Sequence, residues 1–479
     1  MGDPDSERDA GRTVETPYEF PDAEPATAAR SRAESLEPGG ESSESVAVAG
    51  RIMLSRPQGR LAFATLRDWT GEVQLFALER QTENFEAFTR LNLGDWIGVR
   101  GEPVKTRRGE PSVRVREWVL LARARRPFGD KWRGVTDPEI RYRQREVDLW
   151  ANPSSREVLL RRSQMTRRMR ERLWTMGFVE VETPIFHRIP GGAHARPFVT
   201  HYNALDADVY LRIAPELYLK RLVVGGIEKV FELGRVFRNE GLSYRHNPEF
   251  TMLEIYQAYV DYRAMMALTE NLVAGLAEDV VGSTRFTYQG RELDLTPPWR
   301  RATMAELVSE TTGEPADVRT PVDELRRRLI EAGGEVEPSW GSGKLLLELF
   351  EKTTEKSLWD PIFVCDYPVE VSPLARRHRR DPELVERFEP YIAGREIGNG
   401  FTELNDPDDQ RVRFEAQAEE RAAGDEEAMV VDEDYLRALE HGLPPTGGLG
   451  IGVDRLAMLF CDCSHIREVI AFPMLRTER

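Results

Sequence analysis

The chain has 479 residues, which is long enough for roughly two to four domains with sizeable cores. No uninterrupted apolar run is long enough to span a bilayer, and residues 1–5 are acidic where a secretory signal would need an apolar segment. The three cysteines are an odd number that fits a reducing compartment, so we expect a cytoplasmic protein without a membrane partner.

The net charge of −16 is distributed unevenly along the chain. Residues 1–45 hold 12 acidic residues against 4 arginines, a balance of −8 that is half of the total. The same segment is rich in Ser, Pro, Ala and Gly and has few bulky apolar residues, so it is predicted to be a disordered acidic tail. The rest of the chain is only mildly acidic, which leaves room for basic surfaces that bind nucleic acid.

Residues 46–122 have the pattern of a small β-barrel, with a helical stretch at 81–90 after the third strand. This order is typical of an OB-fold, which commonly binds single-stranded nucleic acid. Residues 123–150 are basic and polar and are predicted to be a linker, which either lies against phosphates or is simply solvated. The barrel strands are expected at 46–49, 61–69, 72–78, 95–104 and 112–121.

Residues 151–479 are predicted to form a larger α+β domain. A helical period at 154–176 ends at Gly177, a C-cap signal. The following strands succeed one another without regular crossover helices, which favours a mainly antiparallel sheet flanked by helices. Within this domain, residues 265–345 alternate apolar and charged positions and are expected to be a partly helical insertion. The strands are expected at 178–184, 209–213, 229–237, 249–259, 363–367, 388–392 and 399–404.

A strand, a polar loop and a second strand at residues 229–259 carry the first chemical pattern. Arg238 ends the first strand. In the second strand Phe250, Met252, Glu254 and Tyr256 share one face by the two-residue period. Such a wall suits a nucleotide, with the aromatic ring on the base and the arginine on the α-phosphate. The alternative is an ordinary hairpin with a charged loop.

Carboxylates and glycines at residues 387–406 form the second pattern. Glu389 and Glu396 suit a hard cation such as Mg²⁺, which binds phosphates through one or two carboxylates. Asn399, Phe401 and Glu403 alternate along one strand and therefore face one way. A glutamate in this apolar stretch is costly unless it is paired, and a ligand cation would pair it. The alternative is a structural salt bridge.

A glycine-rich strand at residues 447–452 leads into an apolar helix that carries Arg455. The glycines allow a nucleotide to come close, and Arg455 can lie on a base or reach a phosphate. The segment matches neither the dinucleotide fingerprint nor a Walker A loop. The alternative is a glycine-bearing core strand followed by an ordinary helix.

Three segments in chain order resemble the signature motifs of class II aminoacyl-tRNA synthetases, namely residues 177–186, 237–259 and 448–456. Four further stretches resemble bacterial lysyl-tRNA synthetases, namely residues 189–193, 211–217, 245–250 and 394–401. The resemblance extends from about residue 46 to 476. It implies an OB-fold anticodon-binding domain followed by a class II catalytic domain, in a homodimer that activates L-lysine with ATP and transfers it to tRNA(Lys).

The resemblance also implies the site residues, matched by position in this sequence. Arg238 and Arg455 are catalytic. The residues that bind ATP are Arg238, Glu240, Arg245, His246, Asn247, Phe250 and Arg455. The residues that bind lysine are Gly192, Glu216, Arg238, Glu254, Tyr256, Asn399, Phe401 and Glu403, with Glu216 on the α-amino group and Glu403 on the ε-ammonium. Magnesium is carried by Glu389 and Glu396, and the anticodon is read by Phe63, Gln74 and Glu117.

This implied chemistry needs no protein nucleophile, because positioning and electrostatics suffice. The sequence departs from the family at His194, where a small residue is usual, at residues 145–149, which lack an aromatic, and at residues 461–463. Two alternatives have the same scaffold: a paralogue that delivers lysine to a non-standard acceptor, and a non-catalytic RNA-binding paralogue. The intact barrel argues against the first alternative, and the intact arginines and carboxylates argue against the second.

Overall fold

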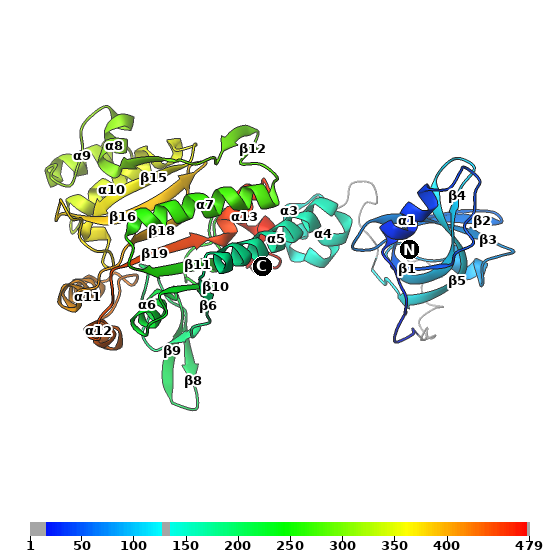
Figure 1. Ribbon diagram of the computed structural model, residues 1–479, viewed down its shortest axis with the longest axis horizontal. Helices are drawn as coiled ribbons and strands as arrows, with labels where there is room; N and C mark the ends of the chain where they lie inside the picture. The colour runs from blue at the N-terminus through cyan, green and yellow to red at the C-terminus, as the bar shows by residue number, and fades with distance from the viewer. Residues whose placement is uncertain (1–15, 127–134, 477–479) are drawn as a thin grey trace, which may run out of the picture. The chain divides into compact units, whose positions relative to one another are not determined.

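The computed structural model describes residues 16–126 and 135–476. The chain divides into two compact units, Met1–Thr136 and Asp137–Arg479, which are drawn in Figure 1. In the described ranges, no helix has both the length and the apolar character needed to cross a membrane.

The first unit contains a closed five-stranded barrel with the strand order β1-β2-β3-β5-β4, which confirms the predicted OB-fold. Alternate residues of β2 are buried, so that Ala62, Ala64 and Leu66 fill the interior while Phe63 and Thr65 face outward. The short helix α2 (Phe85–Thr89) follows β3, as expected. The strands are β1 (Val46–Gln58), β2 (Leu61–Arg67), β3 (Glu72–Leu78), β4 (Trp96–Lys105) and β5 (Pro111–Ala122).

The prediction of a disordered tail at residues 1–45 is wrong for its second half. Helix α1 (Ala26–Glu34) packs against the barrel and buries Ala26, Ala29 and Ala33 completely. Its first turn is held by Asp68, whose carboxylate accepts a hydrogen bond from the Ala26 amide at 2.8 Å. Alanine brings a helix close to a sheet with little bulk, so a count of bulky apolar residues misses this contact. Residues 1–15 lie outside the described residues.

The second unit is built on a nine-stranded sheet with the order β14-β15-β16-β18-β19-β11-β10-β6, and β17 pairs with β16. Only the pairs β14–β15 and β10–β6 are parallel, so the prediction of a mainly antiparallel sheet is confirmed. The strands are β6 (Val179–Glu180), β10 (Lys229–Phe237), β11 (Glu249–Ala258), β14 (Arg300–Thr303), β15 (Ile362–Pro368), β16 (Leu384–Ile392), β17 (Arg395–Glu396), β18 (Gly398–Thr402) and β19 (Thr446–Gly452).

Helices cover both faces of this sheet, and each face has its own hydrophobic core (Figure 1). In β11, Leu253 and Ile255 belong to the core beneath α5 (Pro153–Thr175), α7 (Tyr262–Val280) and α13 (Val453–Phe460). Tyr256 belongs to the other core. That face carries α6 (Glu216–Val224), α8 (Met304–Thr312), α9 (Val322–Glu331), α10 (Ser342–Thr353), α11 (Pro407–Ala422) and α12 (Glu433–Glu440).

Smaller elements complete the unit. One three-stranded sheet has the order β7-β9-β8, with β7 (Phe186–His187), β8 (Val199–Tyr202) and β9 (Ala207–Leu211). A hairpin joins β12 (Arg285–Tyr288) to β13 (Arg291–Asp294). The remaining helices are α3 (Pro138–Arg143), α4 (Arg145–Ala151), α14 (Ile466–Val469) and the 3₁₀ turns η1 (Glu355–Ser357) and η2 (Val369–Val371).

Two predicted boundaries need correction. Most of helix α7 and all of strand β14 lie inside the range 265–345 expected for an insertion, yet α7 covers the main sheet and β14 is the edge strand of that sheet. Helices α3 and α4 fall in the predicted linker, but both belong to the second unit. Alternation of apolar and charged residues marks any half-exposed helix, and it does not reveal which core the helix covers.

Arg145 and Asp148 form a buried ion pair in α4. Arg145 Nη1 donates to Asp148 Oδ2 at 2.8 Å, and its Nη2 donates to the carbonyls of Glu468 and Ile470 near the C-terminus. Burial alone would raise the pKa of Asp148, but hydrogen bonds hold that pKa below its usual value. These come from Asn152, Arg141 and Ser155. The pair therefore ties the C-terminal segment to the start of the second unit.

We expect Asp148→Ala to lower the free energy of unfolding by about 3–5 kcal/mol, because it leaves the Arg145 guanidinium buried without its counter-charge. Urea denaturation of the full chain measures the change. Glu146→Ala is the matched control, since Glu146 is exposed on the same helix and its loss should cost less than about 0.5 kcal/mol. Equal stability of the two variants would contradict a structural role for the pair.

Candidate functional site

A cavity of about 360 Å³ lies on the sheet face opposite α7. Strand β11 contributes Phe250, Met252, Glu254 and Tyr256, as the two-residue period predicts. Every residue that the sequence assigned to ATP, lysine, the metal or catalysis lines this cavity. They are Gly192, Glu216, Arg238, Glu240, Arg245, His246, Asn247, Phe250, Glu254, Tyr256, Glu389, Glu396, Asn399, Phe401, Glu403 and Arg455.

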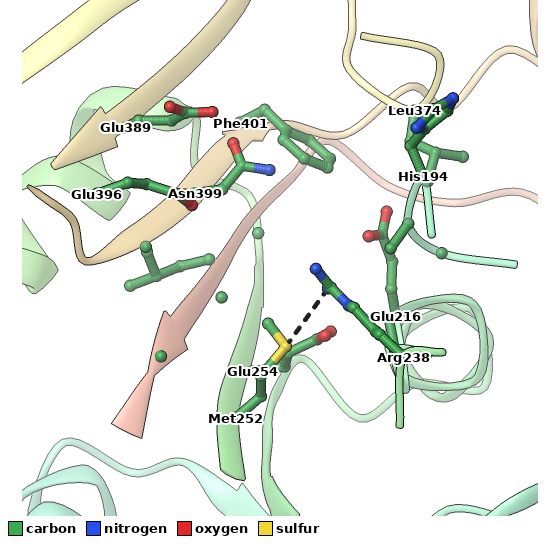
Figure 2. A pocket seen from close by; sticks show the side chains of 18 of the residues that line it. His194, Glu216, Arg238, Met252, Glu254, Leu374, Glu389, Glu396, Asn399 and Phe401 are labelled. Atoms are coloured by element: carbon green, nitrogen blue, oxygen red, sulfur yellow. Dashed lines mark hydrogen bonds between the residues drawn. The ribbon is translucent and has the colours of Figure 1, made fainter. Parts of the chain in front are cut away.

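Arg238 follows β10 directly and projects into the cavity, as Figure 2 shows. Its guanidinium lies over the Phe250 ring, 5.2 Å from the ring centroid, and its Nη2 approaches the Met252 sulfur at 3.9 Å. Among the residues that the structure describes, no carboxylate forms an ion pair with Arg238 within 4 Å. Burial lowers the pKa of Arg238, but arginine stays protonated in proteins, so the cavity contains an unneutralised cation.

Glu389 and Glu396 lie at one end of the cavity, beside Asn399 (Figure 2). Glu389 Oε2 accepts hydrogen bonds from the hydroxyls of Tyr367 and Tyr391, at 2.7 and 3.0 Å. Arg387, to which no role was assigned from the sequence, donates to Glu389 Oε1 at 2.6 Å and to the Asn399 side chain at 2.9 Å. Burial raises the pKa of Glu389; Arg387 opposes this shift and the negative charge of Glu396 adds to it. A cation at this end would relieve that repulsion.

Arg455, in the first turn of α13, connects this end of the cavity to the loop between β10 and β11. Its Nη1 donates to the Glu396 carboxylate at 3.0 Å, and its Nη2 lies 3.3 Å from His246 Nε2. Burial lowers the pKa of His246, and the positive charge of Arg455 lowers it further. The imidazole is therefore held neutral beside the arginine. In the same loop Arg245 pairs with Glu355 at 3.4 Å, and Asn247 Oδ1 is buried without a hydrogen-bond partner in the described structure.

Glu216, Glu254 and Glu403 form a cluster of three buried carboxylates that also face the cavity. The hydroxyl of Tyr256 donates to Glu254 Oε2 at 2.9 Å. Burial raises the pKa of Glu254 to about 8, and the negative charge of Glu216 contributes to the rise. Burial also raises the pKa of Glu403 to about 8. Three neighbouring buried carboxylates favour a cationic ligand. Each added positive charge offsets the free-energy cost of burying a negative charge, and it also reduces the repulsion between the carboxylates.

Lys220 lies behind these carboxylates, and sequence reasoning did not single it out. Its side chain is fully buried in α6, one turn after Glu216. Lys220 Nζ donates to Glu216 Oε1 and to Glu403 Oε2, both at 2.7 Å. The signal that was available is the spacing of Glu216 and Lys220, which places both side chains on one helix face.

Gly448 brings the backbone of β19 against the side chain of Glu403. A Cβ atom at this position would lie 1.8 Å from Glu403 Oε1. That oxygen is buried and has no hydrogen-bond partner in the described part of the chain. Only a residue without a side chain therefore leaves Glu403 in place.

The loop that carries Gly192 borders the cavity and contacts residues 425–427. Gly192 has a φ of +88°, a conformation that favours glycine, and a Cβ atom added there would lie 3.1 Å from the Cβ of Glu216. His194 Nε2 lies 3.0 Å from Asp425 Oδ2, and Nδ1 lies 3.3 Å from Glu427 Oε2. The unusual histidine thus fastens this loop to residues 425–427.

The residues predicted to read an anticodon lie in the barrel unit. Phe63 stacks on Phe76 with ring centroids 5.2 Å apart, and the Gln74 side-chain amide donates to Ser112 Oγ at 2.8 Å. Phe63 and Gln74 are on the outward face of the adjacent strands β2 and β3, where Phe63 pairs with Phe76 and Thr65 with Gln74. Glu117 is exposed on β5, three residues past the segment of β5 that pairs with β3.

Comparisons with known proteins cover both units. Residues 137–476 match the family described as class II tRNA synthetases (D, K and N), and residues 46–121 match the OB-fold nucleic acid binding domain. The chain is 52% identical over 455 residues to the lysine–tRNA ligase of Moorella thermoacetica, covering 94% of this chain and 91% of that protein. It is 55% identical over 449 residues to the lysine–tRNA ligase of a Synechococcus species, covering 92% and 89%.

We expect Gly448→Ala to impair the carboxylate end of the cavity selectively, because the new methyl group must displace Glu403. Calorimetry should detect a loss of lysine affinity of about 100-fold, in line with the cost of moving a binding group by 1 Å, with ATP affinity much less affected. Gly450→Ala is the control, since its Cβ would lie close only to the flexible Met252 methyl group, at 3.1 Å, and would meet its other neighbours at an ordinary contact distance of 3.8 Å. Equal losses for both ligands in Gly448→Ala would refute a local effect on Glu403.

Proposed function

This chain belongs to the class II tRNA synthetases, and we propose that its arginine-lined, acid-rich cavity is where it joins lysine to the α-phosphate of ATP. The chain activates lysine with ATP and transfers it to tRNA, as do the lysine–tRNA ligases that it resembles. The site assignment rests on one observation, namely that side chains of opposite charge line the same cavity. An unneutralised guanidinium at Arg238 lies near three carboxylates, and lysine has the matching anionic and cationic groups.

ATP is assigned to the half of the cavity that contains Phe250 and Arg455. The Phe250 ring offers a stacking surface for adenine, and Glu240 can accept a hydrogen bond from the exocyclic amine. Arg238, Arg245 and Arg455 supply positive charge for the phosphates. His246 and Asn247 complete the loop, and the neutral imidazole can donate one hydrogen bond and accept another.

Lysine is assigned to the half of the cavity that contains the buried carboxylates. Its carboxylate faces Arg238, its α-ammonium faces Glu216 beside Gly192, and its ε-ammonium faces Glu403. Glu254, Tyr256, Asn399 and Phe401 form the walls. A neutral side chain of the same length would leave Glu403 Oε1 buried without a hydrogen-bond partner, so the pocket should reject it strongly.

Glu389 and Glu396 fit a magnesium ion that is held mainly by the ATP phosphates. In the described ranges no cluster of three or more His, Cys, Asp or Glu side chains could hold a metal alone. Magnesium usually uses one or two carboxylates together with phosphate oxygens and water, which suits this pair. When bound, the ion would neutralise phosphate charge during displacement.

The proposed reaction proceeds by positioning rather than through a protein nucleophile. A lysine carboxylate oxygen forms a bond to the α-phosphorus while the bond to the bridging oxygen breaks, which gives lysyl-adenylate and pyrophosphate. The guanidinium of Arg238 lies where charge develops on the carboxylate and the α-phosphate, and it can stabilise both. A terminal ribose hydroxyl of tRNA then attacks the acyl carbon, and AMP leaves.

The barrel unit is proposed to read the anticodon of tRNA(Lys). Phe63 presents a half-buried ring for stacking on an unpaired base, and Gln74 and Glu117 offer hydrogen-bonding groups. We propose a cytoplasmic location, where the three free cysteines would stay reduced.

We also propose a homodimer formed through residues 174–186, which include the first of the three segments that resemble class II signature motifs. Trp174, Val179, Ile185 and Phe186 are exposed apolar residues in this short stretch, which is unusual for a surface that stays in water. Light scattering should give twice the mass of one chain, and Phe186→Glu should shift it toward one chain. Ile330→Glu, at an exposed apolar residue of α9, is the control. A monomeric parent protein would refute the proposal.

The decisive experiment is ATP–pyrophosphate exchange with each amino acid in turn, followed by charging of tRNA(Lys). We expect exchange only with lysine, and charging of tRNA(Lys). Absence of lysine-dependent exchange would refute the assigned cavity and favour a non-catalytic RNA-binding protein. Exchange without charging would favour delivery of lysine to another acceptor.

Two variants separate the two halves of this function within the same assay. Glu403→Gln should raise the KM for lysine by at least about 100-fold with little change in the KM for ATP, because it removes the charge that meets the ε-ammonium. Phe63→Ala should leave exchange intact and reduce charging by about 10-fold, the cost of one lost base–aromatic stack. Equal changes in the KM for lysine and the KM for ATP in Glu403→Gln, or equal losses of exchange and charging in Phe63→Ala, would contradict the roles assigned to these residues.

A further inference from the structure

Lys220 is the positive charge nearest to the acid cluster and yet does not line the cavity. Its ammonium lies between Glu216 and Glu403, 2.7 Å from an oxygen of each. The rings of Tyr435 and Phe401 surround it, with centroids 5.4 and 5.8 Å from Nζ. It therefore contacts the carboxylates from behind and leaves their cavity side open to a ligand.

The two oxygens of Glu403 have different environments. Oε2 accepts the hydrogen bond from Lys220, while Oε1 is buried against Gly448 without a partner in the described residues. A buried carboxylate oxygen without a donor is costly, and a ligand ammonium would satisfy it. The bond to Lys220 fixes the rotation of the carboxylate and so determines where this free oxygen points.

The charge count of the cluster gives Lys220 a second effect. Three ionised carboxylates at Glu216, Glu254 and Glu403 against the Lys220 ammonium would leave two negative charges. The two ammonium groups of lysine balance these charges, while Arg238 meets the carboxylate of lysine. Without Lys220 a third negative charge would remain, and protonation of a carboxylate would be the cheaper outcome. A protonated Glu403 would no longer distinguish a cationic side chain from a neutral one.

We propose that Lys220 is the positioning residue of the lysine side-chain pocket: it orients Glu403 and allows that carboxylate to ionise when the substrate ammonium enters. This inference rests on the proposed function, in which Glu403 meets the ε-ammonium of lysine. Lys220 does not touch the substrate. It acts through Glu403 and Glu216.

The ionisation behaviour of the surrounding groups agrees with this role. Burial alone would lower the pKa of Lys220, but Glu216 and Glu403 raise it well above its usual value, so Lys220 stays charged. Burial raises the pKa of Glu403 to about 8, and Lys220 opposes this rise while Glu216 and Glu254 add to it. The hydroxyls of Tyr256 and Tyr435 also face the cluster, and burial raises the pKa of both, so they remain neutral.

The test compares the pH dependence of the KM for lysine in the full-length parent protein and in Lys220→Met, by ATP–pyrophosphate exchange. In the parent the KM should fall as pH rises through about 8, because lysine binds the ionised form of Glu403. In Lys220→Met this transition should move at least about one unit higher, with a KM at neutral pH roughly 10- to 100-fold above the parent's. Lysine itself titrates identically in both series, so the difference belongs to the protein.

The selectivity for lysine over an uncharged analogue provides a second readout. It should not change if Lys220 only stabilises the fold. Norleucine has the shape of lysine without the ε-ammonium. Lys220→Met should lower the ratio of kcat/KM for lysine to kcat/KM for norleucine by at least about 10-fold, the effect of one unit in the pKa of Glu403. The KM for ATP should change less than about twofold.

Matched variants separate charge from packing. Lys220→Arg keeps the cation and should keep the pH transition of the parent, even if its larger side chain lowers kcat. Lys344→Met removes a lysine charge from α10, where Lys344 pairs with Glu348, and should leave every readout unchanged. The double variant Lys220→Met/Glu403→Gln should be no worse for lysine than Glu403→Gln alone, since Lys220 acts through that carboxylate.

Several outcomes would overturn the proposal. An unchanged pH transition and unchanged selectivity in Lys220→Met would do so, and so would a lower KM for lysine, which would mean that Lys220 competes with the substrate. If the variants do not fold, calorimetry on the parent in two buffers of different ionisation enthalpy replaces them: release of protons on lysine binding near pH 7 supports the role, and no release refutes it. A parent protein without lysine-dependent exchange would instead refute the proposed function.

Discussion

The burial of negative charge is the constraint on which the arrangement of the catalytic unit depends. Glu216, Glu254, Glu389 and Glu403 are all buried, and carboxylates in that position are unstable unless cations or hydroxyls surround them. The structure supplies such partners from separate elements: Lys220 from α6, Tyr256 from β11, and Arg387 with Tyr391 from β16. The acids are thereby held in place in a sheet that otherwise buries apolar side chains.

Strand periodicity was sufficient to predict much of this site. The bounds of β10 and β11 agree with the sequence to within a residue, and the alternation along β11 placed Phe250, Met252, Glu254 and Tyr256 on one wall. This succeeded because a side chain in a strand has only two faces to choose between. The convergence of distant segments on one cavity came from the resemblance to a known family, since periodicity within a strand does not tell which strands are neighbours.

Other features of the structure could not be predicted from local sequence patterns. Helix α1 is anchored by alanines, which carry little compositional signal for burial, and α7 looks like any amphipathic helix until the sheet beneath it is known. Lys220 was missed because a lysine on a helix is normally solvated. Its burial is intelligible only once Glu403, 183 residues further along the chain, is seen beside Glu216.

The glycines of β19 restrict how substitutions can alter the substrate range of this protein. At Gly448 the wall of the acid-rich end of the cavity is formed by the main chain. The space there is therefore limited by backbone atoms and not by a side chain that can adopt another rotamer. Any replacement at this position adds atoms and makes the pocket smaller. Substitutions of the glycines on this strand can therefore narrow the range of amino acids that fit the pocket, but they cannot widen it. A wider substrate range would have to arise on the opposite wall, where side chains can be trimmed.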